Sequence, residues 1–457
     1  MNAVRCLSLL LCMALSACAI APDRSPANVG QIKPQSGGSD TPTRCENVGS
    51  GAERLDPTRI RGCGEAAQAT WLAQPLTAQR ALQAALAQNH ELQAELARLD
   101  AIEAERVQAG LLRNPMLSLM LLQPEGGGRL AIEAGWMQSL FDLLTRSRRV
   151  DLADANARRD RAEIGVRLLE VGWLAQTAFY EAVAAGQRAR LLQQELALDA
   201  QALDLQSRIT RSGLAAQSEL LTMQAMQDER RHMLHELHAQ TIEAQSMLAE
   251  RIGLESRHGL QLPEDFELPE MPDRDVEAWQ QRALAERREL VASAAAVAAA
   301  SAERALETGS WRKTEPDIGA RIERDAEGMA MTGPELRVAL PVFDNGRVRA
   351  DRADALVREA MHRDVAQRRT VLLAVERALD LLLAAADQAA GTAEHLARTQ
   401  VADALAERQH RNGSIGLIER ISAQRAVLAA ERQRLDARLA LARAHVELQR
   451  AVGGGGG

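Results

Sequence analysis

Apolar residues recur in alternating steps of three and four along the stretch from Phe141 to Gly213, which contains no proline. A seam of this period predicts one long helix packed as a coiled coil and ending at Arg211-Ser212-Gly213. At roughly 1.5 Å per residue, such a helix is on the order of 100 Å long, so it must span something. The seam comprises Ile164, Leu168, Val171, Ala175, Ala178, Ala182, Ala185, Ala189, Leu192 and Leu196.

Shorter elements are expected on either side of this helix. The first helix stops before Asn114-Pro115, because the residue before a proline disfavours the helical conformation. A linker rich in proline follows the return helix. The expected elements are a helix over Thr77–Leu112, strands over Leu117–Gln123 and Leu130–Leu140 with the turn Pro124–Gly128 between them, the long helix, a return helix over Gln217–Ile252, and a linker containing Pro263, Pro269 and Pro272.

The same pattern then repeats about 200 residues later. Matching landmarks keep offsets between 198 and 202, which indicates an internal duplication. The matches are Glu91-Leu92 with Glu289-Leu290, Pro115 with Pro316, Phe141-Asp142 with Phe343-Asp344, Ala153-Asp154-Ala155 with Ala353-Asp354-Ala355, Gly213 with Gly413, and Gln224 with Gln424. We expect a signal peptide at 1–17, a tether at 18–72, a first repeat at 73–258, a linker at 259–273, a second repeat at 274–452 and a glycine tail at 453–457.

The strands of the second repeat alternate in polarity. In Asp317–Glu323, isoleucine and alanine side chains oppose charged ones, and Glu335–Leu340 alternates in the same way. Such a pattern fits a membrane barrel with an apolar outside and a wet inside, or an ordinary half-buried hairpin. Leu117, Leu119, Met120 and Leu121 blur the two faces in the first repeat. Four strands cannot close, so a membrane barrel needs several copies of the chain.

The N-terminus predicts export and a lipid anchor. Cys6–Leu15 is an apolar stretch too short to span a bilayer, and it ends in Leu15-Ser16-Ala17-Cys18. That tetrapeptide resembles a lipoprotein cleavage motif, which would attach acyl chains to Cys18 and anchor the chain. An ordinary signal peptide followed by an unmodified cysteine is the alternative. Cys45 and Cys63 are either a disulfide, worth about 3 kcal/mol, or two free thiols.

Composition narrows the class of function. The chain has 55 basic and 62 acidic residues, well mixed, and only 2% aromatic residues, which argues against a nucleic-acid footprint and favours long alanine-rich helices. No catalytic motif and no cofactor motif is present, so we expect no enzyme and no cofactor. His232, His235 and His238 drift around their helix, so a solvated face is the better interpretation than a metal site.

Taken in order, these landmarks resemble the TolC-type outer-membrane efflux channels over about Leu76 to Val452. The resemblance rests on order, spacing and duplication rather than on one motif. Its landmarks are Ala81-Leu82 and Asn89, Asn114-Pro115, Leu140-Phe141-Asp142 and Val342-Phe343-Asp344, Ala178-Phe179-Tyr180, Ser212-Gly213 with Glu219-Leu220-Leu221, and Asn412-Gly413 with Ile418-Glu419.

The resemblance implies a mainly helical homotrimer. Long helices would form a periplasmic α-barrel, and four strands per chain would contribute to one 12-stranded outer-membrane barrel. An inner-membrane pump would deliver substrate, and a periplasmic adaptor would dock on two tips. The tip residues are Ser212, Gly213, Leu214, Asn412, Gly413 and Ser414; glycine there also serves the tight reversal itself.

The family narrows its tunnel near the second tip with acidic side chains, of which Glu419 matches the first. Ser422 stands at the second acidic position and Ile415 where a basic partner is often found, so the pattern is incomplete. A ring of three Glu419 side chains would favour cations, whereas a lone glutamate on a helix is more often a solvated face. Trp136, Phe141 and Phe343 are the candidates for an aromatic rim.

The sequence therefore favours a passive export duct in a tripartite pump, anchored in the outer membrane and extending into the periplasm. A lipid-anchored periplasmic coiled-coil scaffold without a pore is the alternative. Drugs, metal ions and proteins all remain open as cargo, because the pump selects most of it.

Overall fold

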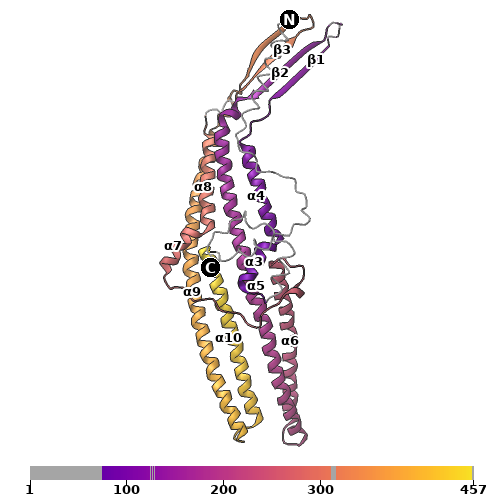
Figure 1. Cartoon of the computed structure of the whole chain (residues 1–457), viewed down its shortest axis with the longest axis vertical. Coiled ribbons are helices and arrows are strands. Elements are labelled where there is room, and N and C mark those ends of the chain that lie inside the picture. Colours follow the sequence, from indigo (N-terminus) through magenta and orange to yellow (C-terminus); the bar gives the residue numbers. More distant parts are fainter. Residues whose placement is uncertain (1–74, 124, 126, 128, 310–314, 455–457) are drawn as a thin grey trace, which may run out of the picture. The chain divides into compact units, whose positions relative to one another are not determined.

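A computed structural model describes residues 75–454, apart from 124, 126, 128 and 310–314. The expected signal peptide and tether, Cys18, and the pair Cys45 and Cys63 lie outside the described residues. All described residues belong to one compact unit. Its elements are α3 (Ala78–Gln88), α4 (His90–Ala109), β1 (Met116–Leu122), β2 (Ala131–Ser139), α5 (Leu140–Arg211), α6 (Gln217–Arg251), a 3-10 turn (Arg257–Gly259), α7 (Val276–Glu286), α8 (Arg288–Glu307), β3 (Asp317–Arg324), β4 (Ala330–Arg337), α9 (Arg347–Arg411) and α10 (Leu417–Val452) (Figure 1).

The order of elements in the first half recurs in the second. In each half, two short helices precede two strands, a long helix and a return helix. The prediction of a single helix over Thr77–Leu112 is wrong, because the helix is interrupted at Asn89. The capping geometry explains the interruption. The Asn89 side chain accepts a hydrogen bond from the Leu92 N–H and donates to the Arg251 carbonyl, so it starts α4 and ties it to the end of α6. Arg287 interrupts the second half at the equivalent point.

The long helix is confirmed. α5 is 72 residues long, and α9, its counterpart, is 65 residues long. The predicted seam of α5 is buried at every position except Val171 and Leu196, which are partly buried. The helix α5 packs against α3, α4, α6, α8 and α10. The small alanine side chains of its seam allow these helices to approach closely.

Four antiparallel strands form one sheet in the order β1-β2-β3-β4. The expected strand over Glu335–Leu340 is misplaced, because β4 starts at Ala330 and ends at Arg337. Backbone pairing decides its position: the turn after β3 is closed by the Asp325 side chain, which accepts from the Glu327 and Met329 N–H groups, and Ala330 then pairs with Arg324. Side-chain alternation beyond Arg337 therefore belongs to a loop.

Two main apolar clusters hold the helices together. One surrounds the middle of α5, where α3, α6 and α10 meet it and where Phe179, Tyr180 and Phe266 stack edge to face. The other joins α7, α8, α9 and α10 in the second half. A smaller cluster packs α3 and α4 on α5. None of the described helices combines the length and the apolar stretch that crossing a bilayer requires.

Candidate functional site

The sheet has one apolar and one charged face, and both are accessible. Cross-strand register places Leu117, Trp136 and Ala320 in one row of the apolar face, with Leu119 and Ile322 in the next. Leu117 is 80% exposed and Trp136 43% exposed. An apolar surface this accessible is characteristic of a membrane-facing or subunit-facing surface rather than a core. Trp136, a candidate rim aromatic, lies on this face.

The opposite face carries charged side chains in ion pairs across three strands. The Arg321 guanidinium on β3 pairs with Glu133 on β2 and with Glu335 on β4, the latter at 3.0 Å. Arg337 pairs with Glu335 at 3.3 Å. Strand β1 contributes methionines to this face instead of charges, which confirms that its two faces are less distinct. The described strands leave the outer edges of β1 and β4 without a hydrogen-bonded neighbour.

The first junction between sheet and long helix is buried. Strand β2 runs directly into α5, and the Leu140 and Phe141 N–H groups donate to the Pro316 carbonyl at 3.0 and 3.2 Å. Phe141 is 6% exposed and Asp142 is fully buried, with its carboxylate 3.4 Å from the Arg113 guanidinium. Phe141 therefore packs inside the chain and is wrong as a rim aromatic.

The second junction is open despite the same Phe-Asp pair. A loop separates β4 from α9. Phe343 is fully exposed, and Leu340 and Val342 are largely exposed. Asp344 accepts a hydrogen bond from the Gly346 N–H at 2.8 Å and pairs with Arg349. The second repeat thus lacks the neighbour that covers the first junction.

A ladder of ion pairs joins α5 to α10, between the two repeats. From the sheet end toward the turns, the pairs are Glu170–Arg450, Glu181–Arg443, Arg188–Asp436, Glu195–Arg432 and Asp199–Arg425. The charged residues of α10 lie seven or four residues apart, so they share one face of that helix. This spacing is a signal in the sequence that could have revealed the ladder.

The ladder ends at a buried carboxylate. Asp199 is 3% exposed and pairs with Arg425 of α10 and with Arg230 of α6, the latter at 2.6 Å. One side chain therefore links three helices, and we call this group the Asp199 clamp. Between the clamp and the two turns, the described residues form no ion pair from one helical hairpin to the other. Each hairpin is instead tied internally, by Gln206 with Glu219 and by Glu407 with Arg420.

Both turns have the same hydrogen bonds, offset by 200 residues. In the first, the Ser212, Gly213 and Leu214 N–H groups donate to the Arg208, Thr210 and Ile209 carbonyls. In the second, Asn412, Gly413 and Ser414 donate to Arg408, His410 and Gln409. Gly213 and Gly413 have φ of 78° and 72°, a conformation that favours glycine. The turns differ in their tips, since Leu214 is 81% exposed and Ser414 is polar.

Glu419 lies in the first turn of α10, close to the second tip. It is exposed, and it forms no ion pair with another described residue. Ser422, one turn later, donates its hydroxyl to the Ile418 carbonyl at 2.9 Å, and Ile415 is partly buried, its carbonyl 3.1 Å from His410 Nδ1. Within one chain, no basic side chain among residues 75–454 that the structure describes pairs with Glu419.

The histidines of α6 do not gather into a metal site. His232, His235 and His238 are all exposed, and His238 lies 3.3 Å from the Gln193 amide. Over the described residues, no three His, Cys, Asp or Glu side chains are placed to hold a metal ion. His445 of α10 is different: burial lowers its pKa, and its ring lies 3.0 Å from the Gln449 amide.

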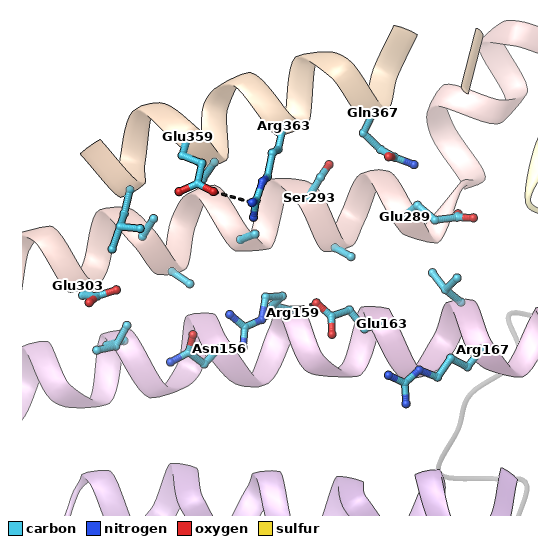
Figure 2. A pocket seen from close by; sticks show the side chains of 18 residues that line it. Asn156, Arg159, Glu163, Arg167, Glu289, Ser293, Glu303, Glu359, Arg363 and Gln367 are labelled. Carbon is cyan, nitrogen blue, oxygen red and sulfur yellow. Dashed lines mark ion pairs between the residues drawn. The ribbon is translucent and has the colours of Figure 1, made fainter. Parts of the chain in front are cut away.

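A long groove runs between α5 and α9 over an alanine-rich face of α8, with a volume of about 830 Å³ (Figure 2). Its rims carry both signs of charge, among them the Glu359–Arg363 pair at 2.5 Å. Ser293 on its floor donates to Asp364, and this hydrogen bond lowers the pKa of that carboxyl. The paired charges and small side chains suit helix packing rather than bond-making chemistry.

Comparison with known proteins finds one matching family model and several solved structures of similar fold. Residues 279–454 match the family model "Outer membrane efflux protein". No curated protein matches the sequence. Among solved structures, the Campylobacter jejuni outer membrane channel CmeC aligns with a TM-score of 0.69 at 12% identity, covering 83% of this chain and 86% of that one.

Two further solved structures share this fold. The Vibrio cholerae outer membrane protein VceC aligns with a TM-score of 0.66 at 16% identity, covering 83% of this chain and 96% of that one. The open state of the Neisseria gonorrhoeae outer membrane channel MtrE aligns with a TM-score of 0.64 at 14% identity, covering 83% and 89%. Because the sequence identities are low, these structural similarities establish the fold alone.

Proposed function

We propose that this chain, whose residues 279–454 match the outer membrane efflux protein family model, belongs to that family and is the outer-membrane duct of a tripartite export system. The observation that carries the proposal is the sheet, with its exposed apolar face, its charged face and its two open edges. Such a sheet cannot stand alone in a membrane, because open edges leave backbone groups without partners in hydrocarbon. Copies of the chain that share one barrel remove the edges.

The contact between the two repeats supports this assembly. Inside one chain, β2 of the first repeat pairs with β3 of the second, and the Pro316 carbonyl caps the start of α5. At the other side of the second repeat, the outer edge of β4 has no neighbouring strand among the described residues, and Phe343 is exposed. A second copy offers β1 and Pro115 at the equivalent place. Repeated around an axis, this head-to-tail contact closes a ring, and three copies give 12 strands.

The helical hairpins provide the periplasmic part of the duct. α5 starts at the end of β2 and continues for 72 residues, so its turn lies on the order of 100 Å from the strand. We assign adaptor docking to the exposed residues of the turns, namely Ser212, Gly213, Leu214, Asn412, Gly413 and Ser414. Leu214 offers an apolar contact, and the two glycines set the backbone geometry. An inner-membrane pump then supplies the cargo.

Glu419 is the proposed gate residue. Its exposure and its lack of a partner among the described residues leave its carboxylate available to the duct. Three copies would place three carboxylates near the tips, where they favour cations over anions. Replacing Glu419 with glutamine should lower cation selectivity without unfolding the hairpin, because the side chain is exposed.

The lipid anchor on Cys18 and the Cys45–Cys63 disulfide are part of the same proposal. Acylation of Cys18 would hold the chain at the outer membrane in addition to its strands. A Cys18→Ala variant should still require detergent, because the exposed apolar face of the sheet remains. If that variant is instead fully soluble in buffer, a scaffold without a pore becomes the better interpretation.

Planar-bilayer conductance of the purified protein tests the duct directly. The proposal predicts discrete channels and particles with threefold symmetry by electron microscopy. Absence of channels together with particles that lack threefold symmetry would contradict it. The Glu419→Gln protein, measured for reversal potential in a salt gradient, tests the gate separately from the duct.

A further inference from the structure

We infer that the charged face of the sheet binds lipophilic organic cations at a hollow centred on Glu323 and Met331; this rests on the proposed function, in which that face lines the duct. The hollow lies over β3 and β4 and has a volume of about 380 Å³. That volume is within the range of roughly 300–1,000 Å³ typical of sites for small organic molecules. All of the residues that line it belong to one chain.

Glycine creates the hollow. Arg321 on β3 is paired in register with Gly333 on β4, and a Cβ at Gly333 would have no atom within 4 Å. The next row places Glu323 opposite Met331. Since residues two apart on a strand share a face, Arg321, Glu323, Met331 and Glu335 all border the space above Gly333.

Among the described residues around the hollow, one carboxylate has no ion-pair partner and can bind a cation. Glu335 is occupied by Arg321 and Arg337, and Arg321 is also paired with Glu133. Glu323 forms no ion pair with another residue that the structure describes, and it interacts electrostatically with Arg321, whose guanidinium is already held by Glu133 and Glu335. The face carries the carboxylates of Glu133, Asp317, Glu323 and Glu335 against the guanidiniums of Arg321 and Arg337. An incoming cation therefore meets net negative charge, and an anion is repelled.

The apolar part of the site is a thioether. Met331 is 52% exposed beside Glu323, and the same row continues through Glu133 to Met120 on β1, which is 53% exposed. Methionine is flexible and polarizable, and it makes favourable contacts with aromatic rings of varied shape. A thioether beside a free carboxylate, in a hollow of this size, fits a cation whose charge is surrounded by aromatic or alkyl groups.

Block of channel current tests the site with three probe ions. Tetraphenylphosphonium carries the expected charge and apolar surface, tetraphenylborate has the same shape with the opposite charge, and tetramethylammonium has the charge with little apolar surface. We expect tetraphenylphosphonium to block at the lowest concentration. Glu323→Gln should raise its half-blocking concentration roughly fivefold, because one nearby opposite charge is lost. Met331→Gln, similar in length, should raise it roughly threefold.

Matched controls are available in the linker between the repeats. Met271 is 48% exposed and Glu267 is also exposed, so Met271→Gln and Glu267→Gln make the same chemical changes away from the sheet. Both should leave the block unchanged. A conducting channel that tetraphenylphosphonium does not block, equal block by tetraphenylborate, or no effect of both sheet variants would overturn the inference.

Equilibrium binding separates this inference from the proposed function. If the protein forms no channel, the duct is contradicted, but tetraphenylphosphonium binding to the full chain in detergent still tests the hollow. Weaker binding by Glu323→Gln and Met331→Gln, with unchanged binding by the linker controls, supports the site. Equal binding by all of these proteins overturns it.

Discussion

The two repeats are the same at their turns and different at their junctions with the sheet. Gly213 and Gly413 close turns with matching hydrogen bonds, whereas Phe141 is buried and Phe343 is fully exposed. A turn depends on its own few residues, so similar sequences give the same geometry. A junction depends on what packs against it, and within one chain the first junction has a neighbour that the second lacks.

This comparison assigns different roles to the same Phe-Asp pair. In the first repeat, Phe141 and Asp142 belong to the core of the single chain, where the Pro316 carbonyl caps α5. In the second, Phe343 is exposed, and in the proposed assembly Phe343 and Asp344 would contact another copy. The internal contact between repeats is then a template for the contact between chains, and each prediction below tests one part of that parallel.

The largest expected effect is at the two phenylalanines. Phe141→Ala should lower the free energy of unfolding by about 3–5 kcal/mol, because it leaves a cavity at a buried junction. Phe343→Ala should change the free energy of unfolding of a single chain by less than about 0.5 kcal/mol while weakening the assembly of copies. Thermal unfolding and size-exclusion chromatography in detergent measure the two effects. Equal losses of stability in both variants would contradict the comparison.

The Asp199 clamp should be next in size. Its carboxylate, Asp199, is in the first repeat, and the second repeat has Thr399 at the equivalent position. Asp199→Ala leaves Arg230 and Arg425 without their carboxylate and should cost about 2 kcal/mol, reduced from the value for fully buried pairs because both arginines are partly exposed. Asp204→Ala removes an exposed pair with Arg208 and serves as the control, with an expected cost below about 0.5 kcal/mol. Similar melting temperatures for the two variants would show that the clamp carries no stability.

The turns should respond equally. Gly213→Ala and Gly413→Ala each place a Cβ on a residue with positive φ, where no other atom lies within 4 Å. Each should therefore cost about 1 kcal/mol from backbone strain alone. Chemical unfolding of the two variants measures this. A difference above about 0.5 kcal/mol would mean that the two turns are held by different contacts.

The smallest effect is a dependence on pH at His445, whose counterpart in the first repeat is Gln245. Burial lowers the pKa of His445 below its ordinary 6.5, so the unfolded chain binds its proton first as the pH falls. Stability contributed by neutral His445 is thus complete above about pH 6.5 and decreases below it, by less than about 1 kcal/mol. His445→Gln should reduce the fall in melting temperature between pH 7.5 and 5.5. An unchanged fall would exclude His445 as its source.

Periodicity predicted the helices well, because a seam of small apolar residues such as Ala175 and Ala182 can serve only one face of one long helix. The tips were predicted because glycine marks a reversal. The position of β4 could not be predicted, since pairing with β3 overrides alternation at Val338 and Leu340. The difference between Phe141 and Phe343 was also hidden, because burial depends on neighbours distant in sequence. The Asp199 clamp joins residues from three helices, and only their packing reveals it.

The most direct test of a duct shared between copies is the native mass of the protein in detergent, measured for the wild type and for Phe343→Glu. The account predicts three chains per particle for the wild type. It predicts single, folded chains for Phe343→Glu, because a charge at the open junction blocks the contact that repeats the internal one. A wild-type protein that is a stable single chain, or a Phe343→Glu protein that remains trimeric, would contradict the account.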